Sequence, residues 1–428
     1  MKIALLLGLG FSRPADMPNI SDITNQAISG KNIWRYTTGR FYLNHNPESE
    51  LVMEKRFNDP ISGNANRYYE AKKRCDSDIC PILHLIRVAK DEIDLYYQGS
   101  KETNYEDIYY FITQLQDAIT GLYDNPAIKK SIESIRRKMK PFFTCNDSVK
   151  TRISSLYHMM DIAKKSKTYI KCIVKEMLYR EHHKIEYLRD SLGSILNDSR
   201  IEIIDIFTLN HDHVVEDFLK PLNIKYADGF GAEGSYGVRY WNYKLYDDES
   251  IKVRLFKLHG SIDWDNIGNG IGIRAGKKSC NIEPVNLSPI MLIGTFNKMI
   301  EYTHGIFAYL YYQFRNRLPQ VNHLIICGYG FGDRGINNTI IEWFESDSVN
   351  KVIVIEPDPE ALKKRVKGRV RNFLFPETLE EEYKAYNRLF SDDPTIEFND
   401  RPKDQPRKWD IIKKGIQSVQ WDEIQDYI

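Results

Sequence analysis

The sequence is poor in cysteine, and its cysteines form no metal-binding pattern. The six cysteines are Cys75, Cys80, Cys145, Cys172, Cys280 and Cys327. Only Cys75 and Cys80 lie close together, and no second cysteine or histidine pair completes a tetrahedral zinc set near them. Scattered thiols of this kind fit the reducing cytosol. We therefore expect a cytoplasmic protein without a structural metal.

Long hydrophobic runs and an excess of either charge are also missing. No apolar stretch reaches the roughly 20 residues that a helix needs to cross a bilayer. The apolar start, residues 1–7, superficially resembles a signal peptide, but Arg13 and Asp16 interrupt it before any small-residue cleavage site, so we interpret it as a buried strand. The net charge is +1, from 60 basic and 59 acidic residues. No global field favours nucleic acid or a membrane surface. We expect no membrane association, and no direct nucleic-acid site is evident, although a local basic patch stays an alternative.

Short, continuous apolar runs are what the sequence does contain, and these are typical of buried parallel strands. They lie at residues 3–7, 201–208, 253–258, 290–293, 323–327 and 352–355. Between the last two, residues 337–344 have apolar positions at helical spacing, which predicts a right-handed βαβ unit. We predict an α/β fold with a doubly wound, mostly parallel, Rossmann-like sheet. The length of 428 residues favours two or three domains.

A helical insertion and a C-terminal extension complete the predicted organisation. Apolar residues recur at helical spacing between residues 108 and 119, within a region rich in Lys, Glu, Ile and Leu. We predict a discontinuous Rossmann-like domain at 1–68 and 196–375, a helical insertion at 69–195 and an extension at 376–428. The extension holds a polar linker at 399–407 and a terminal helix. One face of that helix must be buried on this chain, on a second copy or on a partner, and it consists of Trp409, Ile412, Ile416 and Val419.

The first predicted strand ends in a glycine turn. Gly8 and Gly10 allow a phosphate to approach the backbone closely, and Ser12 lies just beyond them. The full dinucleotide fingerprint would have a third glycine where Arg13 stands, which argues against an ordinary dehydrogenase. A tight turn without any ligand is the alternative.

Polar residues follow the next two predicted strands. Asn210 and Asp212 come after one, and His259 ends the other. Histidine has an ordinary pKa of about 6.5, which suits a general base. The alternatives are turn chemistry for the Asn and Asp and a structural role for the histidine. His211 and His213 could mimic a metal pair, but no third ligand is evident.

The strand at 323–327 ends in a second glycine turn. Gly328, Gly330 and Asp333 follow it, and Glu356 ends the next strand. An acidic residue there can accept hydrogen bonds from ribose hydroxyls, although it can also be a solvated carboxylate. In an open parallel sheet the carboxyl ends of the strands share one edge, so all these segments can converge on a nucleotide cleft.

Taken in order, these motifs resemble the sirtuin-like superfamily, and its bacterial branch rather than the protein deacetylases. The resemblance covers residues 1–30 and about 200–360. The motifs that carry it are Gly8-x-Gly10-x-Ser12, Thr208-x-Asn210-x-Asp212, Leu258-His259-Gly260-Ser261 and Gly328-Tyr329-x-Phe331-x-Asp333.

The resemblance implies that NAD is bound on the sheet and that its nicotinamide–ribose bond is cleaved. Asn210 would orient water or substrate near the ribose, Asp212 would support the nicotinamide pocket, and His259 would be the general base. The implied set of NAD-binding residues is Gly8, Gly10, Phe11, Ser12, Thr208, Gly328, Tyr329, Gly330, Asp333 and Glu356. Of these, the first glycine turn would approach the diphosphate, while Gly328, Tyr329 and Glu356 would face the adenosine half.

One departure from the deacetylases narrows the function. They carry a four-cysteine zinc module after the His-Gly segment, whereas this chain has only Cys280 there, so we expect NAD as substrate and no zinc. Zinc-free bacterial relatives are typically NAD-consuming effectors of antiphage defence. We therefore predict an NAD glycohydrolase that releases nicotinamide and ADP-ribose. The alternatives are an NAD-dependent deacylase or ADP-ribosyltransferase, and a non-catalytic module that senses NAD or ADP-ribose.

The same resemblance implies protein partners. Such relatives often act with a hexameric translocase-type ATPase or a short Argonaute. The helical insertion and the terminal helix also lead us to expect a homo-oligomer.

Overall fold

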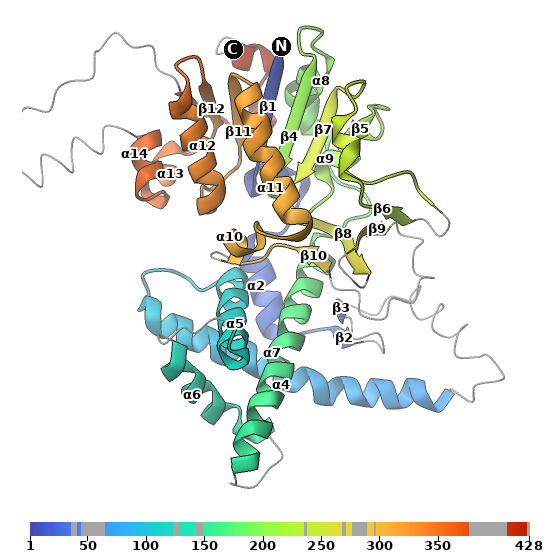
Figure 1. The fold of residues 1–428 in the computed structure, drawn as a ribbon, viewed down its shortest axis with the longest axis vertical. Coiled ribbons are helices and arrows are strands. Elements are labelled where there is room, and N and C mark those ends of the chain that lie inside the picture. The colour runs from blue at the N-terminus through green and yellow to red at the C-terminus, as the bar shows by residue number, and fades with distance from the viewer. Residues whose placement is uncertain are drawn as a thin grey trace, which may run out of the picture.

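A seven-stranded parallel sheet forms the centre of the molecule (Figure 1). The computed structural model describes residues 1–35, 41–43, 65–122, 128–142, 149–234, 238–267, 271–275, 289–294, 297–375 and 409–425. Across the sheet the strands are β13 (Trp409–Ile412), β12 (Lys351–Ile355), β11 (His323–Cys327), β1 (Lys2–Leu7), β4 (Ile203–Thr208), β7 (Val253–Lys257) and β5 (Tyr226–Ala227). Every neighbouring pair is parallel. The predicted α/β fold is confirmed.

The central strand β1 is buried on both faces, as its continuous apolar sequence predicts. Its alternate residues belong to two separate hydrophobic clusters: Leu5 belongs to one and Leu6 to the other. The Leu6 cluster contains residues of α11 (Gly305–Arg317), α12 (Arg334–Ser346), α13 (Pro359–Arg365) and α14 (Arg369–Leu374). The Leu5 cluster contains residues of α8 (Ser194–Asn197), α9 (Val214–Leu219) and α16 (Trp421–Gln425). Helices on both faces make the sheet doubly wound.

A smaller antiparallel sheet contains the strand that directly follows β7. Its strand order is β10 (Pro289–Met291), β8 (Gly260–Ile267), β9 (Ile271–Ala275) and β6 (Val238–Tyr240). The prediction that residues 290–293 form a parallel core strand was wrong. This short run pairs with β8 because the chain reverses immediately after β7, which leaves β8 as its neighbour. A two-stranded pair, β2 (Ile33–Arg35) and β3 (Phe41–Leu43), lies apart from both sheets.

Four helices that lie between β3 and β4 in the sequence are placed beyond the carboxyl ends of the parallel strands (Figure 1). They are α4 (Ala65–Tyr97), α5 (Tyr105–Thr120), α6 (Lys129–Lys138) and α7 (Val149–Leu178), and α2 (Ile20–Ser29) packs against three of them. Helix α5 confirms the predicted amphipathic helix. It starts at a capping box, where Asn104 and Asp107 exchange side-chain bonds, and ends at Gly121. The hydrophobic cluster of these helices is continuous with one face of the sheet, and the division into domains stays a prediction.

The predicted terminal helix around Trp409 was wrong. The chain forms edge strand β13 there, followed by a 3-10 turn at Ile416–Ser418 and then α16. The edge of β12 offers free backbone groups, and pairing with them outweighs the helical spacing of the apolar residues. Ile412, Ile416 and Val419 are 7%, 6% and 2% exposed, so the chain itself buries them. The expected linker at 399–407 lies outside the described residues.

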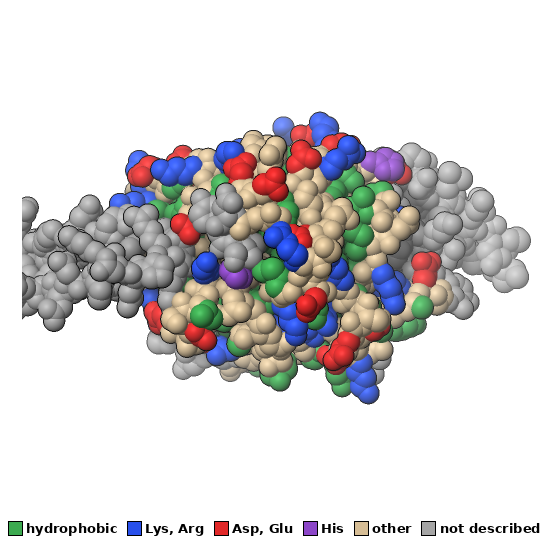
Figure 2. All heavy atoms as spheres, turned by 90° about the horizontal axis from the view of Figure 1, so that it is seen from above, with side chains coloured by type: hydrophobic (Ala, Val, Ile, Leu, Met, Phe, Trp, Pro, Cys, Tyr) green, Lys and Arg blue, Asp and Glu red, His purple; other side chains and the backbone are tan. Residues whose placement is uncertain are grey.

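The outer surface shows no strong bias of charge on the face viewed in Figure 2, where basic and acidic side chains are intermixed. None of the helices that the structure describes combines the length and the hydrophobicity needed to cross a bilayer.

Candidate functional site

Backbone hydrogen bonds join the carboxyl ends of four adjacent strands and bring the sequence motifs to one edge. Each bond is 2.9 Å long and links the residue after one strand to the end of its neighbour. The bonds run from Gly8 N to Cys327 O, from Leu209 N to Leu7 O and from Leu258 N to Thr208 O. The motifs after β11, β1, β4 and β7 therefore lie in the same order as the strands. The strand order reverses between β1 and β11, where open α/β sheets bind ligands.

The two glycine turns pack directly against each other at this reversal. Gly10 N donates to Gly328 O at 2.9 Å. Gly328 has φ of 63°, and a Cβ added there would lie 2.2 Å from Phe11 N. A Cβ on Gly8 would lie 2.6 Å from Gly328 O. The glycines are thus required by the contact between the turns. The amide of Gly10 is used in that contact.

Asn210 is fixed to the first glycine turn by its side chain. Its Nδ2 donates to Gly8 O at 2.8 Å and to Ser12 Oγ at 2.9 Å. Its backbone N donates to Thr208 Oγ1 at 3.1 Å, so the end of β4 holds the same turn. Asn210 and Ser12 are 8% and 1% exposed. Both amide hydrogens are used, while none of the described residues donates to Oδ1, which is left to accept a bond from water or substrate.

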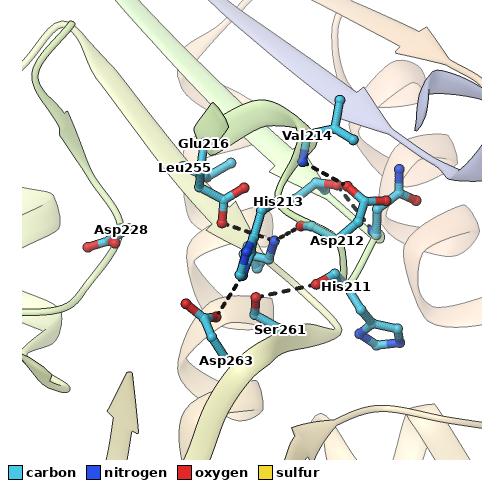
Figure 3. Close-up of polar contacts among 12 residues, drawn as sticks. His211, Asp212, His213, Val214, Glu216, Asp228, Leu255, Ser261 and Asp263 are labelled. Atoms are coloured by element: carbon cyan, nitrogen blue, oxygen red, sulfur yellow. Dashed lines mark hydrogen bonds and ion pairs between the residues drawn. The ribbon is translucent and has the colours of Figure 1, made fainter. Parts of the chain in front are cut away.

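Asp212 stabilises the start of α9 rather than pointing freely into a cleft. Its Oδ1 accepts a hydrogen bond from Val214 N at 3.1 Å, and Lys257 Nζ donates to its backbone O (Figure 3). Tyr187 lies close enough that the charge of Asp212 contributes, after burial, to raising the tyrosine pKa. The Tyr187 hydroxyl in turn donates to Phe11 O at 2.7 Å. Asp212 therefore acts through its charge on Tyr187, the residue that binds the turn after β1.

His259 forms a closed hydrogen-bonded group with two side chains from other elements. Its Nε2 lies 2.9 Å from Tyr302 Oη and 3.1 Å from Asp333 Oδ2. The Tyr302 hydroxyl donates to the same Asp333 oxygen at 2.8 Å. All three residues are less than 8% exposed. Among the described residues, none forms a hydrogen bond with His259 Nδ1.

Charges around this group set its protonation. Burial raises the pKa of Asp333, but the hydrogen bond and charge of His259, then Lys298, lower it to about 2. Burial and then the charge of Lys298 lower the pKa of His259, while Asp333 and Glu106 oppose the shift. Burial also lowers the pKa of His211, whose ring centroid lies 6.3 Å from that of His259. At neutral pH His259 is therefore a neutral imidazole beside an ionised carboxylate.

The helices beyond the sheet contribute to this site. Lys298 on α10 (Asn297–Glu301) is 9% exposed, and its Nζ lies 3.4 Å from both carboxylate oxygens of Glu106 at the start of α5. Since both charges affect the pKa of His259, the ion pair lies near the imidazole ring.

Hydrogen bonds among its own residues and the start of α12 stabilise the second glycine turn. The Tyr329 hydroxyl donates to Asn337 Oδ1 at 2.8 Å, and Asn337 Nδ2 donates to Phe331 O at 2.8 Å. Asp333 Oδ1 caps α12 by accepting from Gly335 N and Ile336 N. Tyr329 and Asp333 are thus engaged inside the protein.

The remaining expected NAD-binding residues lie toward the other end of the edge. Glu356 follows β12, where its Oε1 accepts from Asp358 N at 3.1 Å and its Oε2 lies 3.7 Å from Arg365 NH2. The exposed Gly330 lies near the same arginine. Glu356 therefore stands apart from the group around His259.

A buried cluster of ion pairs is hydrogen-bonded to the loop after β4. Arg274 bridges three carboxylates, since its Nε, NH1 and NH2 contact Asp263 at 2.5 Å, Asp228 at 2.6 Å and Glu216 at 3.2 Å. Lys257 Nζ also donates to Glu216 at 3.1 Å and to the backbone O of Asp212, so it links the cluster to Asp212. We call these residues, with Arg239, which pairs with Asp228, the Arg274 cluster. It ties β9 and β8 of the small sheet to β7 and α9 of the large one.

The described residues contain no group of three His, Cys, Asp or Glu side chains placed to hold a metal ion. His211 and His213 point to different sides of their loop, and His213 faces Asp263 (Figure 3). Cys280 lies outside the described residues.

Residues 205–375 match the SIR2-like domain. The match begins within β4 and includes Asn210, His259 and Asp333, while the first glycine turn lies outside it. None of the curated proteins compared with the chain matches it. The SIR2-like domain supports the sirtuin-like resemblance and, because such domains use NAD, an activity related to NAD.

Three residues around His259 could not be predicted from the sequence. Tyr302, Lys298 and Glu106 end no strand and belong to no motif. No signal in the sequence alone pairs them with His259, because their contacts depend on how α5 and α10 lie over the sheet.

Proposed function

We propose that the chain is an NAD glycohydrolase that hydrolyses NAD to nicotinamide and ADP-ribose. The observation that carries the proposal is the pair of adjacent strand ends that present Asn210 and His259. The histidine has a lowered pKa, and none of the described residues forms a hydrogen bond with its Nδ1. A neutral imidazole of this kind is a suitable general base at neutral pH.

The chemistry needs little more than these groups. When the bond between ribose C1′ and the nicotinamide nitrogen breaks, the bonding electrons go to the nicotinamide ring and neutralise its positive charge. A water oxygen then bonds to C1′, and its proton passes to His259. Asn210 Oδ1 can orient that water, because the amide is fixed by its bonds to Gly8 and Ser12. Of the expected NAD-binding residues, Glu356 would lie on the adenosine side.

The burial of the site supports an activity that depends on an assembly. Asn210, His259 and Ser12 are 8%, 4% and 1% exposed, so NAD needs an opening movement to reach them. We propose that such an opening follows assembly into a homo-oligomer or with a protein partner. On the sirtuin-like resemblance, that partner is a hexameric translocase-type ATPase or a short Argonaute, and the role is antiphage defence in the cytoplasm.

Nicotinamide release tests the proposed reaction. The full-length protein, alone and with its candidate partner, is incubated with NAD, and products are separated by chromatography. We expect nicotinamide and ADP-ribose from the wild type, and a fall in kcat of about 10²- to 10⁴-fold in His259→Ala. Asn210→Asp, which keeps the size of the side chain, should also lose turnover. The exposed His182→Ala is the matched control and should behave like the wild type.

Other outcomes identify the alternatives. An O-acyl product or labelled protein would indicate a deacylase or an ADP-ribosyltransferase. Tight NAD binding without turnover, even with the partner present, would indicate a sensing module. Unchanged turnover in His259→Ala would refute the assignment of the base.

A further inference from the structure

The arrangement around His259 assigns a role to two residues that lie far from it in sequence. We propose that Asp333 and Tyr302 are positioning residues that fix the His259 ring and its tautomer, with the proton on Nε2 and the lone pair on Nδ1. The inference rests on the proposed function for its kinetic consequence, but the tautomer itself can be measured without any activity.

The geometry supports this tautomer. Asp333 Oδ2 accepts from the Tyr302 hydroxyl at 2.8 Å and lies 3.1 Å from His259 Nε2. An ionised carboxylate can only accept, so the nitrogen that faces it must carry the proton. The 2.9 Å contact between His259 Nε2 and Tyr302 Oη agrees, because the Tyr302 hydroxyl hydrogen is donated to Asp333, which leaves Oη to accept from Nε2–H. Nδ1 is then the acceptor nitrogen available to take a proton from water or a ribose hydroxyl.

Asp333 is itself held rigidly. Its other oxygen, Oδ1, accepts from Gly335 N at 2.9 Å and from Ile336 N at 3.2 Å at the start of α12. Its backbone N donates to Tyr329 Oη at 3.1 Å. With both oxygens bound and 4% exposure, Asp333 is engaged with the protein rather than with a nucleotide. The sequence motif that suggested NAD binding is thereby given a different role, through the base.

The decisive variant is Asp333→Asn. The amide oxygen still accepts from the start of α12, whereas the amide NH₂ donates to His259 Nε2 and forces the proton onto Nδ1. The base would then have no lone pair where it is needed. We expect kcat to fall about 10²- to 10⁴-fold while KM stays unchanged. Tyr302→Phe leaves the carboxylate in place and should cost about tenfold or less.

A control separates this effect from loss of a helix cap. Asp358 caps α13, its Oδ1 accepting from Ala361 N at 2.9 Å, and it makes no contact with His259. Asp358→Asn should leave kcat unchanged. If Asp333 instead binds the nucleotide, Asp333→Asn will raise KM and leave kcat intact, and the proposal is wrong.

Nitrogen NMR of histidine-labelled protein gives the readout that does not depend on turnover. His259→Ala assigns the signals, and the ¹⁵N shifts report which ring nitrogen is protonated. We expect the Nε2–H tautomer in the wild type and the Nδ1–H tautomer in Asp333→Asn. The same tautomer in both proteins would overturn the positioning role. The expected tautomers in a protein that cleaves no NAD would uphold it and refute the proposed reaction instead.

Discussion

At the scale of single residues, the site is defined by side chains whose polar atoms are almost all committed. Asn210 uses both amide hydrogens on the first glycine turn, and Asp333 uses both oxygens on α12, Tyr302 and His259. Among the described residues, none forms a hydrogen bond with Asn210 Oδ1 or His259 Nδ1. These two acceptors fit a reaction in which water must be oriented and then deprotonated.

The pH dependence of NAD cleavage should follow the ionisation of His259. Burial and Lys298 lower its pKa, and Asp333 and Glu106 only oppose this, so the neutral base forms below the ordinary value of about 6.5. We expect kcat/KM to rise with pH through an apparent pKa below 6.5 and to be level at pH 7. The other ionisable groups near the ring are His211 and Tyr302. A pH profile of nicotinamide release measures this rise of kcat/KM. A rise centred above pH 7 would contradict the assignment of His259 as the general base.

The free energy of unfolding should also rise with pH over the range in which His259 loses its proton. Because the folded state disfavours protonated His259, the unfolded chain binds more protons as the pH falls below about 6.5. The contribution of His259 to stability is therefore present above that pH and lost below it.

At the scale of elements, the buried Arg274 cluster joins the two sheets beneath the loop that carries Asn210 and Asp212. Arg274 has three carboxylate partners, and its side chain is 11% exposed. The small sheet is thus held to the large one by charge rather than by apolar packing alone.

Removing Arg274 should destabilise the fold severely. Arg274→Met leaves Glu216, Asp228 and Asp263 with less compensating charge in a buried site, which should cost about 3–5 kcal/mol. Arg369→Met is the matched control, because it breaks a pair with Glu345 in which both side chains are more than half exposed, and should cost about 0–1 kcal/mol. Midpoints of urea unfolding compare the two. Equal shifts would show that the cluster is not a structural tie.

The elements also show what sequence reasoning can and cannot reach. The strands β1, β4, β7, β11 and β12 were predictable because both of their faces are buried and their apolar runs are continuous. Strands β10 and β13 were not predictable, because whether such short segments form strands depends on the strands that they pair with, β8 and β12. The contact of Asp333 with His259 spans 74 residues. It follows only from the strand order and register, which composition and spacing do not determine.

At the scale of the whole molecule, the helices beyond the sheet are in electrostatic contact with the site. The Lys298–Glu106 ion pair connects α10 to α5, and both charges act on His259. A movement of these helices would therefore change the pKa of His259 as well as its exposure to solvent.

This connection predicts opposite shifts from two neutralising variants. Glu106→Gln removes a charge that raises the pKa of His259, so that pKa should fall, whereas Lys298→Gln removes one that lowers it, so that pKa should rise. NMR titration of the His259 ring measures both. The exposed Glu133→Gln on α6 is the control and should shift nothing. Shifts of the same sign in both variants would mean that the ion pair does not act on the ring through its charges.

The central place of β1 has a consequence for how the protein is made. This strand precedes both of its neighbours in the chain, residues 203–208 and 323–327, so it cannot pair until they have been synthesised. Asn210 needs Gly8 and Ser12 to be oriented, and His259 needs Asp333. A ribosome-bound chain that stops before Asp333 therefore carries no finished site. If the protein destroys NAD, the producing cell meets that hazard only from chains that extend beyond Asp333, and translation products that stop before it are harmless.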